Sequence, residues 1–169
     1  MNKTPQSTYR IRFNDCDLFG HLNNSKYLDY FINAREDHLK QFYEFDLSEY
    51  YKSNLGWVVW SHEIAYVRPA KYNEMVMIQS SLLSACDQFL HFEAIMLDEN
   101  QNHLKAIMRT KLIHVSTVTG KKELHSSDFL KWAKTIENQE ANQIPDLQAR
   151  IKQLTSILKD NKHYSLTNK

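Results

Sequence analysis

Residues 15–35 read DCDLFGHLNNSKYLDYFINAR, and they join a polar loop to the start of an apolar helical pattern. The aspartates and the glycine favour turns, so residues 15–22 are predicted to form a loop. From Tyr27 onward, apolar residues recur every three or four positions, which predicts a helix. Asn23 or Asn24 would cap its first turn. The sequence therefore gathers carboxylate, imidazole and amide groups at one helix N-terminus.

After this helix the pattern changes to one typical of β-strands. Four segments rich in β-branched and aromatic residues follow, and they are separated by short polar turns. The predicted elements are a short strand at 8–13, a short helix at 46–54 ended by Gly56, and long strands at 57–68, 74–85, 89–98 and 103–117. Long strands joined by short turns are most simply antiparallel. One long helix against such a sheet gives an α+β domain of two layers.

The C-terminal part of the chain has a different character, so we divide the chain into a core domain, residues 1–125, and a helical extension, residues 126–169. SSDFLKWAK, at 126–134, is typical of a capped helix, and ENQEANQ, at 137–143, of a polar linker. A second helix is expected after Pro145. Its apolar stripe consists of Leu147, Ile151, Leu154 and Leu158. Such a stripe needs a partner, and we favour the chain's own sheet or a sister subunit over another protein.

Composition excludes several classes of function. The 169 residues carry a formal net charge of +1, with no basic run, so neither nucleic acid nor an anionic membrane is an expected partner. Cys16 and Cys86 are too few for a disulfide framework and favour a reducing cytoplasm. No apolar run has the length of a signal peptide or a bilayer span. The histidines and cysteines lack metal-ligand spacing, so no metal is expected.

The polar loop has the groups that acyl transfer requires. The first N–H groups of a helix have no partner inside the helix, and the dipole makes this end partly positive, so it can hold a developing oxyanion. Asp17, folded back by a turn at Gly20, could face the same carbonyl as nucleophile or as general base for water. His21 and Asn23 could orient it. The alternative is that these residues only form the turn and the cap.

The stretch RIRFNDCDLFGHLNNSKYLDYFINAR strongly resembles the signature of hotdog-fold acyl thioesterases, of the hydroxybenzoyl-CoA and long-chain acyl-CoA type. That family carries a pattern close to D-x-D-x-x-G-H-x-N-N-x-x-Y with an Ala-Arg pair further along the helix. This chain matches at Asp15, Asp17, Gly20, His21, Asn23, Asn24, Tyr27, Ala34 and Arg35. Residues 66–73 resemble a second landmark of the family, with Asn-Glu where Gly-Asp is usual. The resemblance covers residues 8–120.

The resemblance implies a hotdog fold, in which an antiparallel five-stranded sheet wraps a long central helix. It implies an acyl-CoA thioesterase with Asp17 as the catalytic carboxylate, Gly20 and His21 lining its loop, and the backbone N–H near Asn24 polarising the thioester carbonyl. No cofactor is implied.

Other residues of the motif receive supporting roles from the same resemblance. Asn23 and Tyr27 would support the loop or the acyl pocket. Asp15 is expected to be structural, and Arg35 to be a helix or interface residue. Enzymes of this type are dimers or tetramers with active sites between subunits, which implies a homodimer or homotetramer here.

Three choices stay open at this point. Arg68 and Lys71 could bind the phosphates of coenzyme A, or they could belong to a solvated basic turn. The carrier could be an acyl carrier protein instead of coenzyme A. A non-catalytic protein that binds acyl thioesters, or a scaffold that docks a partner through its last helix, is the alternative of another class.

Overall fold

The computed structural model describes residues 1–167, and for residues 161–167 the backbone alone, so the last two residues of the predicted extension lie outside the described part. The strands are β1 (Gln6–Arg10), β2 (Leu55–Tyr66), β3 (Met75–Ala85), β4 (Phe89–Asp98) and β5 (Leu104–Ser116). The helices are α1 (Lys26–Tyr43), α2 (Leu47–Lys52), α3 (Ser127–Ile136), α4 (Gln139–Asn142) and α5 (Leu147–Thr167). A single turn of 3-10 helix spans Phe13–Asp15.

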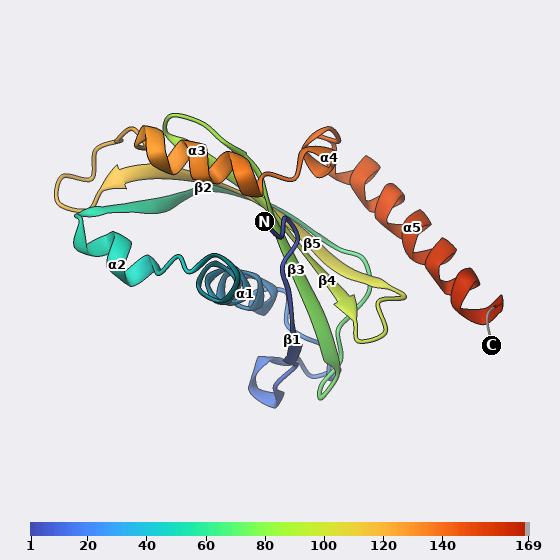
Figure 1. Cartoon of the computed structure of the whole chain (residues 1–169). Helices are drawn as coiled ribbons and strands as arrows, with labels where there is room; N and C mark the ends of the chain where they lie inside the picture. Colours follow the sequence, from blue (N-terminus) through green and yellow to red (C-terminus); the bar gives the residue numbers. More distant parts are fainter. Residues whose placement is uncertain (168–169) are drawn as a thin grey trace.

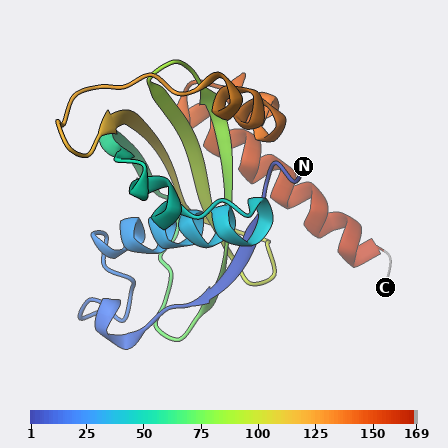
Figure 2. The ribbon, with the colours of Figure 1, turned by 60° about the vertical axis from the view of Figure 1, so that its left-hand side comes forward.

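The predicted α+β architecture is confirmed. The strands form one antiparallel sheet in the order β1-β3-β4-β5-β2. The sheet curves around α1, which lies across its concave face, whereas α5 lies on the opposite face (Figures 1 and 2). None of the helices described in residues 1–167 is long and apolar enough to cross a membrane.

Three local predictions were wrong. The first strand ends at Arg10, three residues early, because the chain turns into the 3-10 segment. Gly56 belongs to β2; the short helix before it ends at Lys52, and Asn54 makes the turn with a φ of +62°. The expected linker at 137–143 contains α4, whose Ala141 is buried.

The main core lies between α1 and the concave face of the sheet. The buried face of α1 includes Tyr27, Phe31 and Ala34, at the three- and four-residue spacing seen in the sequence. The strands contribute Ile78, Phe92, Ala94, Met96 and Met108. Burying one large apolar side chain is worth about 1.5–3 kcal/mol, so this face fixes the helix on the sheet.

The apolar stripe of α5 packs on the chain's own sheet. Leu147, Leu154 and Leu158 are buried against the convex face, which contributes Met77, Ile95, Leu97, Leu104 and Ile107. This finding confirms the favoured reading of the stripe and leaves those leucines unavailable to another protein. The division of the chain at residue 125 stays a prediction.

A buried ion triad anchors α5 to the sheet. Glu93 on β4 accepts from Arg109 on β5 at 2.8 Å and from Arg150 on α5 at 2.9 Å, and all three residues are buried. Removing one member of such a cluster costs about 3–5 kcal/mol, because a charge is left buried without its partner. The triad therefore ties the extension to the core.

A buried histidine connects α1 to two strands. His38 has no solvent exposure, and its ring nitrogens lie 2.8 Å from Ser80 Oγ and 3.1 Å from Ser7 Oγ. Burial, reinforced by the nearby Arg35 cation, lowers the pKa of His38 to about 4. The histidine is therefore neutral at pH 7.

This lowered pKa predicts that acid destabilises the fold. The unfolded state takes up the proton near pH 6.5 and the folded state near pH 4, so stability declines as the pH falls between these values. We expect His38 to account for a loss of about 2 kcal/mol between pH 7 and pH 5. Urea unfolding at both pH values should show a correspondingly smaller decline in His38→Gln; an equal decline in both proteins would contradict the assignment.

Candidate active site

A closed turn between β1 and α1 positions Asp17. The N–H of Asp17 donates to the carbonyl of His21 at 2.8 Å, and the N–H of Gly20 donates to the carbonyl of Asp17 at 3.1 Å. Gly20 has a φ of +71°, and a Cβ there would meet no atom within 4 Å. The backbone conformation, and not crowding, is therefore what favours glycine at this position.

The carboxylate of Asp17 is held through one oxygen. Its Oδ1 accepts from the N–H of Phe19 at 2.9 Å and from the N–H of His21 at 3.0 Å. No group in the described part of the chain donates to its Oδ2, and the side chain is exposed. The arrangement fixes the direction of the carboxylate and leaves one oxygen free to contact a water or a reacting group.

The start of α1 lies in the same region. Ser25, and neither of the predicted asparagines, holds the N-cap position. Asn23 serves the preceding turn, where its Oδ1 accepts from the N–H of Ser25 at 3.0 Å. Within residues 1–167, the N–H of Asn24 has no hydrogen-bond acceptor. It is thus an unsatisfied donor at the positive end of the helix.

A cavity of about 320 Å³ brings these groups together. Its lining comprises Asp17, His21, Leu22, Asn24, Tyr27, Tyr66, Val67, Arg68 and Pro69. Five residues singled out in the sequence therefore share one cavity, although they come from the loop, from α1 and from the turn after β2. Their chemistry is that of a carboxylate, an imidazole, a free N–H and an exposed guanidinium.

The other predicted site residues lie outside this lining. Gly20 and Lys71 hold the loop against the turn after β2: the carbonyl of Gly20 accepts from the N–H of Tyr72 at 2.8 Å, and His21 forms a backbone bridge with Lys71. Asn23 supports the turn before α1. Asp15 faces Tyr30, whose hydroxyl donates to its Oδ2 at 2.9 Å.

A pair of tyrosines completes the site, and the sequence reasoning did not assign Tyr66 to it. The rings of Tyr27 and Tyr66 meet edge to face, with centroids 5.1 Å apart. Tyr66 donates its hydroxyl proton to the carbonyl of Asn24 at 2.9 Å, and the Tyr27 hydroxyl accepts from the N–H of Ala70 at 3.0 Å. The position of Tyr66 directly before the Val-Arg-Pro turn is the signal that could have identified it.

Comparisons with known proteins place the chain in a family. Residues 11–133 match the thioesterase-like superfamily, and the chain belongs to that family. The match ends inside α3. A search of curated proteins finds no match. The curved sheet around one long helix is the hotdog fold, as the sequence predicted.

Solved structures share this fold at low sequence identity. The DHNA-CoA thioesterase of Staphylococcus aureus gives a TM-score of 0.73 at 17% identity, over 85% of this chain and 96% of its own. Slr0204, a 1,4-dihydroxy-2-naphthoyl-CoA thioesterase of Synechocystis, gives 0.69 at 14% identity, over 81% and 98%. AQ1494, a hypothetical protein of Aquifex aeolicus, gives 0.68 at 23% identity, over 75% and 96%. These likenesses show the fold alone.

The tyrosine pair leads to a prediction about stability. Tyr27→Phe leaves the buried N–H of Ala70 without an acceptor, so we expect a loss of about 1–3 kcal/mol in the free energy of unfolding. Tyr66→Phe is the control: the carbonyl that it frees lies on exposed Asn24, where water replaces the hydroxyl, so the loss should stay below about 1 kcal/mol. Urea unfolding measures both. Equal losses would contradict the role given to Tyr27.

Proposed function

We propose that the protein hydrolyses an acyl-CoA thioester to a free acid and coenzyme A. One observation carries the proposal: Asp17, whose Oδ2 is free, and Asn24, whose N–H is unsatisfied, line one cavity. A carboxylate and a hydrogen-bond donor on one carbonyl group are what thioester hydrolysis needs. The thioesterase-like family to which the chain belongs supports a thioesterase activity in general.

In the proposed reaction the thioester carbonyl oxygen lies on the N–H of Asn24. Asp17 removes a proton from a water molecule as the water attacks the carbonyl carbon, and the developing negative charge is stabilised at the helix N-terminus. Collapse of the tetrahedral intermediate breaks the C–S bond and releases the thiolate of coenzyme A, which takes up the proton. Alternatively, Asp17 attacks directly, and water hydrolyses the resulting anhydride.

Other lining residues have supporting roles in this proposal. His21, whose N–H donates to Asp17, and the tyrosine pair shape the cavity around the reacting carbonyl. Arg68 is exposed at its edge, where a guanidinium suits a phosphate of coenzyme A, and Lys71 lies three residues along in the same turn. Coenzyme A is the carrier we favour, because the similar proteins of S. aureus and Synechocystis are named as CoA thioesterases.

A reducing cytoplasm is the location that we propose for the protein. Cys16 and Cys86 are both free thiols, which suits such a compartment.

An exposed sheet edge supports a homodimer. β2 is the last strand of the sheet and is 12 residues long, so one side of its backbone has no partner strand among residues 1–167. Val58, Val59 and Trp60 on this strand are each about half exposed or more. Long apolar edge strands are rare on monomers, because they pair with other chains. We propose that β2 pairs with its counterpart in a second copy.

The dimer proposal predicts the mass in solution. Light scattering after size exclusion should give twice the 20.0 kDa of one chain, or a further doubling if dimers pair. Trp60→Lys adds a charge to the edge and should shift the protein toward the monomer. Lys131→Ala, at an exposed position on α3, is the control and should leave the mass unchanged. A wild-type monomer at micromolar concentration would contradict the dimer.

The catalytic proposal is tested by thiol release from a panel of acyl-CoA esters of different chain length, including aromatic ones. Asp17→Asn keeps the Oδ1 acceptor that holds the loop but removes the basic and nucleophilic oxygen, so we expect a loss of at least about 10²-fold in kcat/KM with unchanged stability. Asp15→Asn, in the same loop but bonded to Tyr30, should retain activity within a few-fold.

Three results would contradict this proposal. Turnover that survives in Asp17→Asn would mean that the loop is a turn and cap without a catalytic role. If the wild-type protein cleaves no CoA ester but cleaves esters of acyl carrier protein, the carrier is not coenzyme A. If it binds thioesters without cleaving any, it is not a hydrolase.

A further inference from the structure

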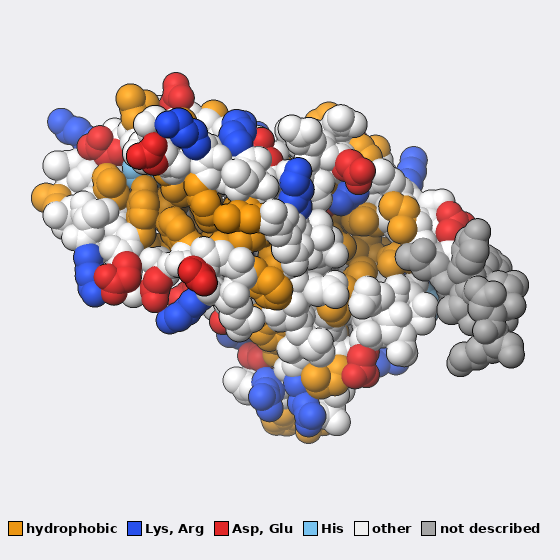
Figure 3. Space-filling view, viewed as in Figure 1, with side chains coloured by type: hydrophobic (Ala, Val, Ile, Leu, Met, Phe, Trp, Pro, Cys, Tyr) orange, Lys and Arg blue, Asp and Glu red, His pale blue; other side chains and the backbone are white. Residues whose placement is uncertain are grey.

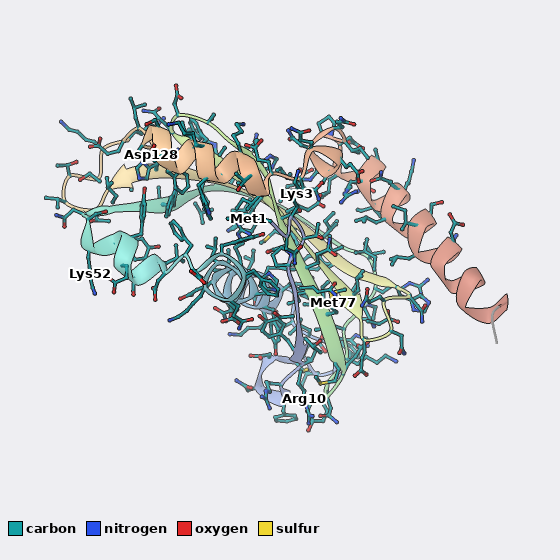
Figure 4. All side chains as sticks on the ribbon, viewed as in Figure 1. Met1, Lys3, Arg10, Lys52, Met77 and Asp128 are labelled. Atoms are coloured by element: carbon teal, nitrogen blue, oxygen red, sulfur yellow. The ribbon has the colours of Figure 1, made fainter. Side chains whose placement is uncertain are left out.

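A second cavity lies at the other end of α1. It has a volume of about 360 Å³ and lies between α1, α2, α3 and the concave face of the sheet. Figure 3 shows apolar side chains lining a hollow in this part of the surface. Lys52 on α2 and Asp128 on α3, labelled in Figure 4, mark its two sides. The volume is within the range of cavities that hold small ligands, about 300–1,000 Å³.

The walls of this cavity are mostly apolar. They include aliphatic and aromatic side chains from all the surrounding elements, among them Leu39, Phe45, Trp57, Leu90, Leu112 and Trp132. The two cavities have no lining residue in common. Tyr27 and Arg35 line the two cavities from α1, where they are eight residues, or about 12 Å at the rise of an α-helix, apart. The second cavity is therefore a separate site.

One cation, Arg35, lies in this apolar wall without an anionic partner. Its Nη1 makes a long hydrogen bond of 3.4 Å to Ser80 Oγ, and its Cζ lies 5.8 Å from the centre of the Phe92 ring. Within the described residues, no carboxylate lies within ion-pair distance of it. Glu36 also lines the cavity, but it is exposed and does not pair with Arg35.

The surroundings of Arg35 offer it no negative charge. The ionisable groups beside it, His38 and Tyr43, are neutral at pH 7. Burial lowers the pKa of Arg35, yet a guanidinium stays protonated at neutral pH. Arg35 is partly exposed to the cavity, and its polar neighbours Ser80 and Tyr43 offer it hydroxyl groups but no carboxylate, so a guanidinium with five donors has hydrogen-bonding capacity left for an anion.

We propose that this cavity binds a free apolar carboxylic acid, with its carboxylate on the guanidinium of Arg35 and its chain or ring along the apolar walls. Charge complementarity selects the carboxylate, and the lining selects the apolar body. The guanidinium can take both carboxylate oxygens at once. Binding needs no turnover, so the site does not depend on the proposed thioesterase activity, although the acid released by that activity has the same chemistry.

The cavity supplies its own probe of occupancy, because Trp57 and Trp132 line it. Titration of the full chain with dodecanoate should change the tryptophan fluorescence, with affinity at least about tenfold higher than for dodecanol, which has the same chain without the charge. Arg35→Met should lower the affinity for dodecanoate to that for dodecanol. Arg35→Lys keeps the positive charge but cannot donate to both carboxylate oxygens at once, so it should retain part of the preference for dodecanoate over dodecanol.

Two further variants locate the ligand. Leu47→Trp would fill the cavity from a partly exposed position on α2, and should weaken the binding of both ligands while leaving Arg35 unchanged. Arg68→Met removes the cation of the other cavity and should leave dodecanoate binding unchanged. All titrations are repeated in Asp17→Asn, which lacks the proposed catalytic carboxylate but should bind dodecanoate as the wild type does. A loss of hydrolysis and a loss of acid binding are then separate results.

The proposal is overturned by equal affinity for dodecanoate and dodecanol, or by dodecanoate binding that persists in folded Arg35→Met. It is also overturned if Arg68→Met abolishes binding, because the acid would then occupy the other cavity. One more pattern would overturn it. In that pattern free acids do not bind, the wild type hydrolyses dodecanedioyl-CoA faster than dodecanoyl-CoA, and Arg35→Met loses that preference. The occupant of the cavity would then be the distal carboxyl group of a substrate and not a free acid.

Discussion

The burial of α1 inside the curved sheet is the constraint on which the rest of the structure depends. Phe31 and Ala34 are fully buried against strands that lie far apart in the sequence. Once this face is fixed, both ends of the helix are fixed as well. The N-terminus comes to lie beside the turn after β2, and the C-terminal half comes to lie beside α2 and α3. Each end borders one of the two cavities.

The candidate active site is built from backbone geometry more than from side-chain contacts. Two N–H groups of its own loop hold Asp17, and the loop is held in turn by backbone bonds to the strand–turn segment near Tyr72. This arrangement places a directed carboxylate next to a helix terminus without burying either charge. Both residues line one cavity, which is where water and a substrate would reach them.

The sequence predicted the parts of the structure that follow from periodicity and local turn chemistry. The spacing of apolar residues identified α1 and the stripe of α5, and the polar loop pointed to Asp17, His21 and Asn24, which line one cavity. Gly56 was misread because glycine both ends helices and occurs in strands, and only tertiary pairing with Val115 decides between them. Tyr66 and the unpaired state of Arg35 depend on contacts between distant segments, which one sequence does not show. Arg35 was expected to be a helix or interface residue, and nothing in its local pattern indicated a cavity.

The central claim is that Asp17 and the N–H of Asn24 act on one thioester carbonyl. A crystal structure with a dodecanoyl-CoA analogue, in which a methylene group replaces the thioester sulfur, tests it most directly. The account predicts the carbonyl oxygen within hydrogen-bond distance of the Asn24 N–H and the carbonyl carbon facing Oδ2 of Asp17. An analogue bound with its carbonyl away from both groups would contradict the account.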